Sequence, residues 1–239
     1  MNKERFRFFP VALHESDLWI GIPHAAYSQK IVRTAYTELQ RLRRILETYI
    51  SAHPDFETSL EALPLPSEPD RIPEEIQIML ACGAQTRTGP MSSVAGLFAE
   101  FVGKRLLLEF ELQEVVVENG GDLYLKNTAE LVSAIHAGTS ALSDKLAFSI
   151  PPGARGICTS SGTLGHSLSL GKADALTVIA ASTPLADAWA TSLANRVKGP
   201  EDMELVLEQV AGLPEILACA VIVGDQVGVR GEIELKLLP

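Results

Sequence analysis

The sequence predicts an α+β protein in which antiparallel sheets carry helices on one side. An amphipathic helix pattern runs from Ile31 to Tyr49, and an Asn-Gly pair at 119 and 120 stands between two β-rich runs. The order helix, strand, glycine-aspartate turn, strand also occurs twice, in residues 90–125 and again in 184–229. This weak repeat suggests two similar half-units, each with a sheet and covering helices.

Composition and charge exclude several classes of protein. With 46% hydrophobic and 21% charged residues, the 239-residue chain has the balance of a globular protein. Its net charge of −10 argues against nucleic acid or an anionic membrane as a partner, because both need a surplus of Lys and Arg. The sequence shows no signal peptide and no membrane-spanning stretch, and its three cysteines are odd in number. We therefore expect a cytoplasmic protein, monomeric or a homo-oligomer.

The first part of the chain predicts a hairpin, a long helix and a connector. Short apolar runs at 5–13 and 17–22 are typical of paired strands. The helix that follows has an apolar stripe and a charged, solvated face, and the prolines of 54–73 indicate a connector without regular structure. We expect one domain, 1–239, in which 1–53 form the hairpin and helix, 54–73 the connector and 74–239 the main body with the site.

The main body opens with two predicted helices. The first begins at Pro73, and the second runs from Pro90 to about Arg105. One face of the second helix carries only small side chains, namely Ser92, Gly96, Ala99 and Gly103. Either another element packs closely against this face, or a ligand binds near the helix start, where free N–H groups favour an anion. Glu100 interrupts the apolar stretch, and we expect it at an edge.

Short strands are predicted after this helix. Asn119-Gly120-Gly121-Asp122 is typical of a hairpin, since both residues of such a turn need positive φ. Later β-rich runs lie at 131–137, 145–150 and 156–159, and the closing ones at 216–223 and 229–237, with a helix at 203–211 between these groups.

Polar residues gather after the strand at 156–159. The segment CTSSGTLGHS has hydroxyls at Thr159, Ser160, Ser161 and Thr163 and glycines at Gly162 and Gly165. Its N–H groups could wrap an anionic group, and His166 could act as a general base near neutral pH. A plain turn is the alternative. A P-loop is excluded by the spacing of the glycines in this region, and a Cys158–His166 nucleophilic pair is less favoured than inert packing of the cysteine.

Asp187 and Thr191 lie four residues apart, on one face of a helix that begins near Pro184. A carboxylate and a hydroxyl oxygen are suitable hard ligands for Mg²⁺ or Ca²⁺, particularly if backbone carbonyls and a phosphate complete the shell. The alternative is an acid stabilised by the helix start, beside a surface threonine.

Three segments carry a resemblance to a known family: NGGDLYL at 119–125, CTSSGTLGHSLSLGKADALTVIA at 158–180 and ADAWATSLANRV at 186–197. Together they resemble an uncharacterised prokaryotic family related to ApbE, the flavin transferases. The resemblance implies an ApbE-like α+β fold with duplicated antiparallel sheets. It also implies that the protein binds FAD or FMN with Mg²⁺ and transfers FMN to a threonine hydroxyl of an acceptor protein.

The resemblance also implies roles for individual residues. The metal would be held by Asp187, Thr191 and the main-chain carbonyl of Ala95, which lies in the segment SSVAGL. The ligand would lie against the glycine turn and the polar loop: Asn119, Gly120, Gly121, Asp122, Thr159, Ser160, Ser161, Gly162 and Thr163. His166 would take the proton of the acceptor hydroxyl.

The chain departs from the ApbE pattern at two places. The segment His-x-x-Asp-Pro-x-Thr-Gly has at most His166 as its counterpart, and Gly96 stands where the related enzymes carry a lysine. An alternative prediction is therefore a protein that binds a flavin or nucleotide, or assembles with a partner, but has lost the transfer step. A structural role through oligomerisation is the third alternative.

Overall fold

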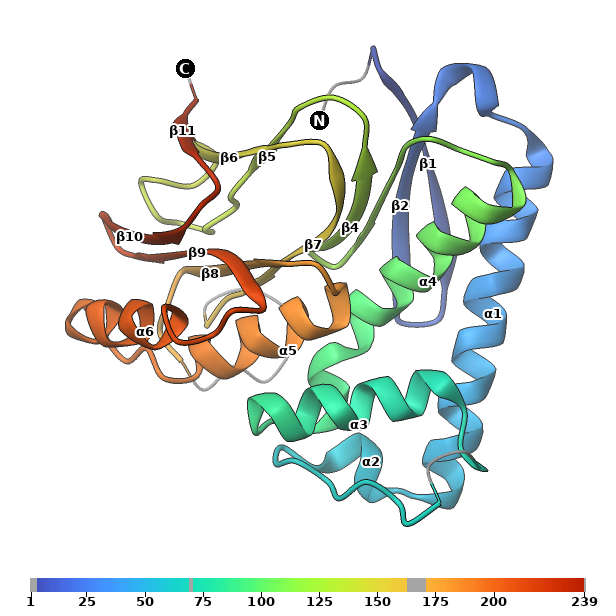
Figure 1. The fold of residues 1–239 in the computed structure, drawn as a ribbon, viewed down its shortest axis with the longest axis horizontal. Helices are drawn as coiled ribbons and strands as arrows, with labels where there is room; N and C mark the ends of the chain where they lie inside the picture. The colour runs from blue at the N-terminus through green and yellow to red at the C-terminus, as the bar shows by residue number, and fades with distance from the viewer. Residues whose placement is uncertain (1–3, 69–70, 163–170, 239) are drawn as a thin grey trace.

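The computed structural model describes residues 4–68, 71–162 and 171–238. Its strands form two antiparallel sheets, an eight-stranded one in the order β1-β2-β3-β4-β7-β8-β9-β10 and a three-stranded one in the order β11-β6-β5. Helices cover one side of the large sheet, and the small sheet lies on its other side (Figure 1). The predicted α+β class is confirmed.

The strands of the large sheet are β1 (Phe6–Leu13), β2 (Ser16–Pro23), β3 (Val115–Asn119), β4 (Asp122–Asn127), β7 (Gly153–Ser160), β8 (Ala175–Ala180), β9 (Ile216–Val223) and β10 (Gln226–Gly231). Those of the small sheet are β5 (Leu131–Ala134), β6 (Leu146–Ile150) and β11 (Leu235–Leu237). The α-helices are α1 (Gln29–Ala52), α2 (Asp55–Thr58), α3 (Glu74–Thr86), α4 (Val94–Glu109), α5 (Thr183–Ala194) and α6 (Met203–Val210). Short 3₁₀ helices lie at His24–Ala26, Pro90–Ser93 and Pro200–Asp202.

The first half of the large sheet comprises β1 to β4, and α1 and α4 pack on it. The stripe predicted for the long helix is buried, from Ile31 to Leu46, and it contributes to one core with the inward residues of β1, β2 and β3. Ser28 caps this helix by accepting a hydrogen bond from the N–H of Ile31 at 3.4 Å. The charged residues face outward because the apolar stripe occupies the side towards the sheet.

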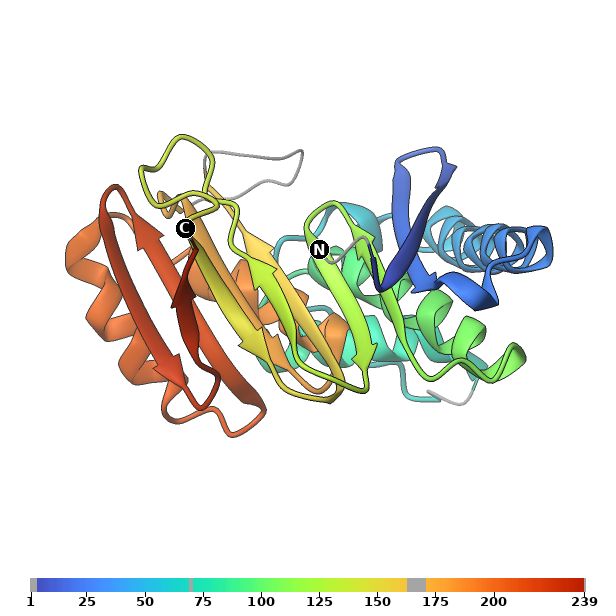
Figure 2. The same ribbon diagram turned by 90° about the horizontal axis from the view of Figure 1, so that it is seen from above.

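The second half of the sheet comprises β7 to β10, with α5 and α6 packed on the same side as α1 and α4 (Figure 2). Antiparallel pairing of β4 with β7 joins the halves into one continuous sheet. The two predicted glycine turns lie at equivalent places, between β3 and β4 and between β9 and β10. The weak sequence repeat therefore corresponds to two similar packing units side by side.

The small sheet buries a separate core against the side of the large sheet that the helices leave open. Phe148 and Ile150 of β6 belong to this core together with Ile157, Ile179 and Ile222 of the large sheet. These strands have nearly continuous apolar sequences because both of their faces are covered. Within the described residues, no helix is long and apolar enough to span a membrane.

The connector differs from the prediction in one respect. Residues 55–58 form the single-turn helix α2 despite the surrounding prolines. Pro54 precedes the turn, where a missing N–H costs nothing, and the buried ring of Phe56 anchors it to the main core. Tertiary burial therefore overrides the local preference for irregular structure.

The small-residue face of α4 is packed against protein on two sides. A Cβ atom at Gly96 would lie 2.7 Å from the carbonyl oxygen of Thr183, and one at Gly103 would lie 2.3 Å from the ring of Tyr124. Glycine at these positions lets α4 approach both α5 and the sheet. Of the two alternatives predicted for this face, the structure therefore shows close packing of other elements. The same approach brings the start of α4 next to α5.

Gly103→Ala tests this packing. The added methyl group would overlap the buried Tyr124 ring, so we expect the free energy of unfolding to fall by roughly 1–3 kcal/mol, although alanine favours a helix by up to about 1 kcal/mol. Urea denaturation measures the change. Gly212→Ala is the matched control, because its nearest contact would be an ordinary 3.5 Å. Equal stability of the two variants would contradict the packing argument.

Candidate functional site

A cavity of about 900 Å³ opens between the start of α4, the β3–β4 turn, the end of β7 and α5. Its volume lies in the range of small-molecule sites, roughly 300–1,000 Å³. Most of the predicted site residues line it: Ala95, Asn119, Gly120, Gly121, Asp122, Thr159, Ser160, Ser161, Asp187 and Thr191. Gly162 does not line it, and Thr163 and His166 lie outside the described residues. Segments almost 100 residues apart in the chain thus meet at one cavity.

The centre of the site is the contact between α4 and α5. The carboxylate oxygen Oδ2 of Asp187 accepts a hydrogen bond of 2.8 Å from the N–H of Gly96, and the N–H of Ala95 also donates to this carboxylate. These N–H groups belong to the first turn of α4 and have no partner within their own helix. Asp187 therefore caps α4 from a neighbouring helix, where the helix dipole favours its negative charge.

The β3–β4 turn holds the other side of Ala95. The side-chain amide of Asn119 donates to the Ala95 carbonyl oxygen at 3.2 Å. Gly120 and Gly121 have φ values of 63° and 105°, so the predicted positive-φ turn is present. Glu118 Oε1 accepts a 2.8 Å hydrogen bond from the N–H of Gly121, which fixes the turn.

Asp122 begins β4 and lies beside the end of β7. The thiol of Cys158 and the N–H of Thr159 donate to its carboxylate. Burial, with the nearby Glu118, raises the pKa of Asp122 to about 7 despite these hydrogen bonds. Burial and the charge of Asp122 also raise the pKa of Asp187 well above its ordinary value. Two mutually repelling carboxyl groups therefore share the floor of the cavity.

Cys158 behaves as a packing residue. It is fully buried, and burial together with Asp122 and Asp187 raises the pKa of its thiol well above the ordinary value. Its Sγ also lies 3.5 Å from the carbonyl oxygen of Thr183, so its single S–H has two acceptors within reach. A thiol held in its neutral form is a poor nucleophile, in agreement with the expectation from the sequence.

The expectation for Glu100 was wrong. Glu100 is only 6% exposed, and its Oε2 accepts a 2.6 Å hydrogen bond from the N–H of Thr183, the first residue of α5. Lys104 reaches the other oxygen at 2.6 Å from a more exposed position. Glu100 thus caps α5 from α4, while Asp187 caps α4 from α5. The sequence could not show this reciprocal arrangement, because it depends on how the two helices cross.

Two residues that the sequence did not point to also line the cavity. Arg43 of α1 contacts Ser16 at 3.1 Å and forms ion pairs with Glu15 and Glu47. His136, just after β5, has its Nδ1 3.0 Å from Oδ2 of Asp144. Nothing in the local sequence distinguishes Arg43 from the other charged residues of α1, and only the tertiary structure brings it to the cavity.

The cavity at the α4–α5 contact is lined by oxygen donors of the kind that Mg²⁺ prefers. No three His, Cys, Asp or Glu side chains gather as a metal site among the described residues, so the set would combine the Asp187 carboxylate, the Thr191 hydroxyl and the Ala95 carbonyl. All three are hard oxygen donors. No ion pair within the described part of the chain joins Asp122 or Asp187 to a Lys or Arg. A divalent cation would offset their repulsion and favour their ionised forms.

The fold places this protein in a known structural class. It resembles the solved apo structure of the flavinyl transferase ApbE from Pseudomonas stutzeri, with a TM-score of 0.53, 16% identity and 94% of both chains covered. An ApbE protein from Thermotoga maritima gives a TM-score of 0.61 at 12% identity, with 95% of this chain and 97% of that chain covered. At these identities the likeness concerns the fold, which is α+β and ApbE-like.

Comparison of sequences gives the family. Residues 1–212 match the family described as "AbpE bacteria", and the chain belongs to it. A UPF0280 protein of Methanocaldococcus jannaschii is 34% identical over 230 residues, which cover 93% of this chain and 90% of that protein. A UPF0280 protein of Methanothermobacter thermautotrophicus is 38% identical over 196 residues, covering 80% and 75% respectively. The resemblance inferred from the three sequence motifs is confirmed.

The raised pKa of Asp122 predicts a pH dependence of stability. The folded chain binds this proton more tightly than the unfolded chain, whose carboxyl group has a pKa near 3.8. The stabilisation is complete below this value and is lost as the pH rises through about 7. Urea denaturation between pH 4 and 8 should therefore show wild type losing stability relative to Asp122→Asn. Parallel pH profiles for the two proteins would contradict this account.

Proposed function

We propose that this protein binds FAD, or another nucleotide pyrophosphate, together with Mg²⁺ in the cavity at the α4–α5 contact, and that it transfers FMN to a hydroxyl group of an acceptor protein. The observation that carries the proposal is the meeting of Ala95, Asp187 and Thr191 beside the glycine turn in one open cavity. Membership of the family and the ApbE-like fold agree with it.

Different residues of this chain would bind different parts of the ligand. The polar end of β7 offers the hydroxyls of Thr159 and Ser160 for a ligand's phosphates or sugar, and Thr159 is held by a 2.8 Å hydrogen bond to Thr177. Asp187, Thr191 and the Ala95 carbonyl would hold Mg²⁺, which supplies charge stabilisation for a pyrophosphate when it is bound. The glycine turn leaves room for close approach because no side chain projects there.

The transfer itself would proceed as a substitution at phosphorus. The acceptor oxygen forms a bond to the phosphorus atom of the FMN half of FAD, and the pyrophosphate bond to AMP breaks. AMP leaves with the bonding electron pair, and the acceptor proton passes to a base. His166 is our candidate for this base because it belongs to the polar segment after β7; the residue itself lies outside the described residues.

A binding protein without catalysis is the second candidate. Its support is the sequence at two positions: Gly96 replaces the lysine that the resemblance leads one to expect, and the His-x-x-Asp-Pro-x-Thr-Gly segment has at most one counterpart. In the structure, Gly96 lies against Thr183 and Asp187, where a larger residue would clash. Tight flavin binding without turnover would favour this candidate.

Asp187→Ala tests the magnesium-dependent binding. Wild-type melting temperatures are measured with FAD, FMN, ATP, NAD and thiamine diphosphate, each with and without Mg²⁺. We expect about 2.7 kcal/mol of stabilisation from the true ligand at a hundredfold excess over its dissociation constant. The variant should lose the part that depends on Mg²⁺, whereas Asp225→Ala, an exposed control outside the cavity, should keep it. If ligand stabilisation of Asp187→Ala depends on Mg²⁺ as in wild type, Asp187 is not a ligand of the metal.

His166→Ala tests the base. With FAD, Mg²⁺ and a pool of threonine-containing peptides, mass spectrometry would follow FMN attached to peptide. Loss of a general base should slow transfer by about 10²–10⁴-fold while FAD affinity is retained. His136→Ala is the matched comparison, because His136 also lines the cavity. If only His136→Ala loses transfer, the role of general base belongs to His136. If wild type binds FAD but transfers no FMN, the non-catalytic candidate is favoured.

A further inference from the structure

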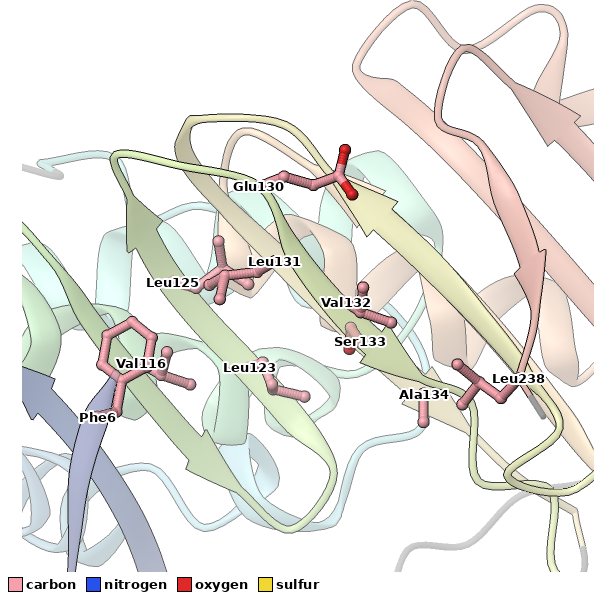
Figure 3. A pocket seen from close by; sticks show the side chains of 10 residues that line it. All are labelled: Phe6, Val116, Leu123, Leu125, Glu130, Leu131, Val132, Ser133, Ala134 and Leu238. Atoms are coloured by element: carbon pink, nitrogen blue, oxygen red, sulfur yellow. The ribbon is translucent and has the colours of Figure 1, made fainter. Parts of the chain in front are cut away.

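A second, mostly apolar cavity of about 350 Å³ lies next to the first, on the side of the large sheet away from the helices (Figure 3). Its floor consists of apolar side chains from β1, β3 and β4, namely Phe6, Val116, Leu123 and Leu125. One wall is formed by five consecutive residues, 130–134, which include all of β5. A cavity that touches every residue of a strand, whichever way the side chains point, runs along the edge of that strand.

No described strand pairs with the edge of β5 that faces this groove. Strand β5 is the last strand of the small sheet and pairs with β6 alone among the described strands. In β6, the N–H of Ser149 donates to Glu234 on the β11 side, so the residues of β6 that bond to β5 are its neighbours Phe148 and Ile150. Their partners in β5 are Ser133 and Leu131.

This register determines which backbone N–H and C=O groups lie on the free edge of β5. Because Leu131 and Ser133 bond to β6, the backbone N–H and C=O groups of Val132 and Ala134 point the other way, towards the groove. The pair Ile135 and Leu146 continues the same alternation, with a 2.8 Å hydrogen bond. Outward donors and acceptors on alternate residues are the pattern that an added strand recognises.

The large sheet beneath the groove extends well past the small sheet. Beyond β5, the same face carries Phe8 and Trp19, whose rings stack with centroids 6.1 Å apart, and Trp19 is 41% exposed. In the other half of the molecule the small sheet covers this face. The next strand position after β5 would therefore lie over an apolar floor that no strand covers within the described residues.

The charges beside the groove are already paired. Lys236 contacts Glu130 at 3.0 Å, and Arg5 is held by Glu114. The groove therefore favours an extended segment with uncharged, apolar side chains over a charged small molecule. The backbone edge favours a polypeptide over a lipid chain, because a lipid chain cannot satisfy the hydrogen-bonding groups of Val132 and Ala134.

We propose that an extended segment of the acceptor polypeptide binds in this groove as a fourth strand of the small sheet, beside β5. The groove is continuous with the candidate site, since Leu123, Ser133 and Ala134 line both cavities. β5 also leads directly to His136, which lines the first cavity. A segment paired with β5 would carry its next residues into that cavity, where a threonine hydroxyl could meet the flavin phosphate. The identity of the segment as acceptor rests on the proposed function.

The test begins with the full-length chain and a displayed library of random seven-residue peptides with a fixed central threonine. The strongest binder is synthesised, and its dissociation constant is measured by fluorescence anisotropy. Val132→Pro removes one N–H from the free edge and none from the ladder with β6, which an edge strand tolerates. We expect at least tenfold weaker peptide binding in Val132→Pro. Val132→Thr, which keeps the N–H and the side-chain shape, should stay within about twofold of wild type.

Hydrogen exchange of the wild-type chain gives a measurement that needs no variant. The bound peptide should slow exchange at Val132 and Ala134. The groove assignment is overturned if no peptide is selected, if protection falls elsewhere, or if Val132→Pro binds as tightly as Val132→Thr. If wild type forms a dimer in which these amides are protected without peptide, the assignment is also overturned, because a second copy of the chain then occupies the groove.

FAD titration of the same proteins separates this inference from the proposed function. Wild type, Val132→Pro and Val132→Thr should bind FAD equally, because the substitution leaves the α4–α5 contact intact. If wild type binds the peptide but not FAD, the groove assignment stands and the transferase proposal is contradicted. If wild type binds FAD but no peptide, only the groove assignment is contradicted.

Discussion

The pair of hydrogen bonds between α4 and α5 is the interaction on which the site depends. Asp187 accepts from the first turn of α4, and Glu100 accepts from the first residue of α5. Each bond satisfies N–H groups that a helix start leaves without an internal partner. Since both acids are buried, loss of either would leave polar groups unpaired away from water. The crossing of the two helices is thereby fixed, and with it the position of the Ala95 carbonyl.

Glycine makes this crossing possible and also shapes the cavity. At Gly96 the helices are too close for a methyl group, because Thr183 and Asp187 occupy the space. At Gly120 and Gly121 the reason is different: positive φ closes the β3–β4 turn in two residues and leaves its surface bare. The first kind of glycine positions the oxygen donors, whereas the second leaves space above them for a ligand.

The two halves of the large sheet are packed alike on the helix side and differently on the other. Helices α1 and α4 cover the first half as α5 and α6 cover the second. Among the described strands, however, the small sheet ends at β5, and none of them covers the outer strands of the first half. This asymmetry produces an apolar groove next to the polar cavity. The two cavities adjoin and share only Leu123, Ser133 and Ala134, so a ligand and a partner could approach from adjacent surfaces.

Local sequence patterns determined the secondary-structure elements and many of the residues that line the site. The apolar stripe of α1, the Asn-Gly turn and the i, i+4 pair of Asp187 and Thr191 are set by neighbouring residues, so they can be predicted from the sequence. Only the tertiary structure decided that Glu100 is buried, that α2 forms among prolines and that Arg43 reaches the cavity. These features depend on contacts between segments far apart in the chain, and no local periodicity encodes how two distant helices cross or where a sheet ends.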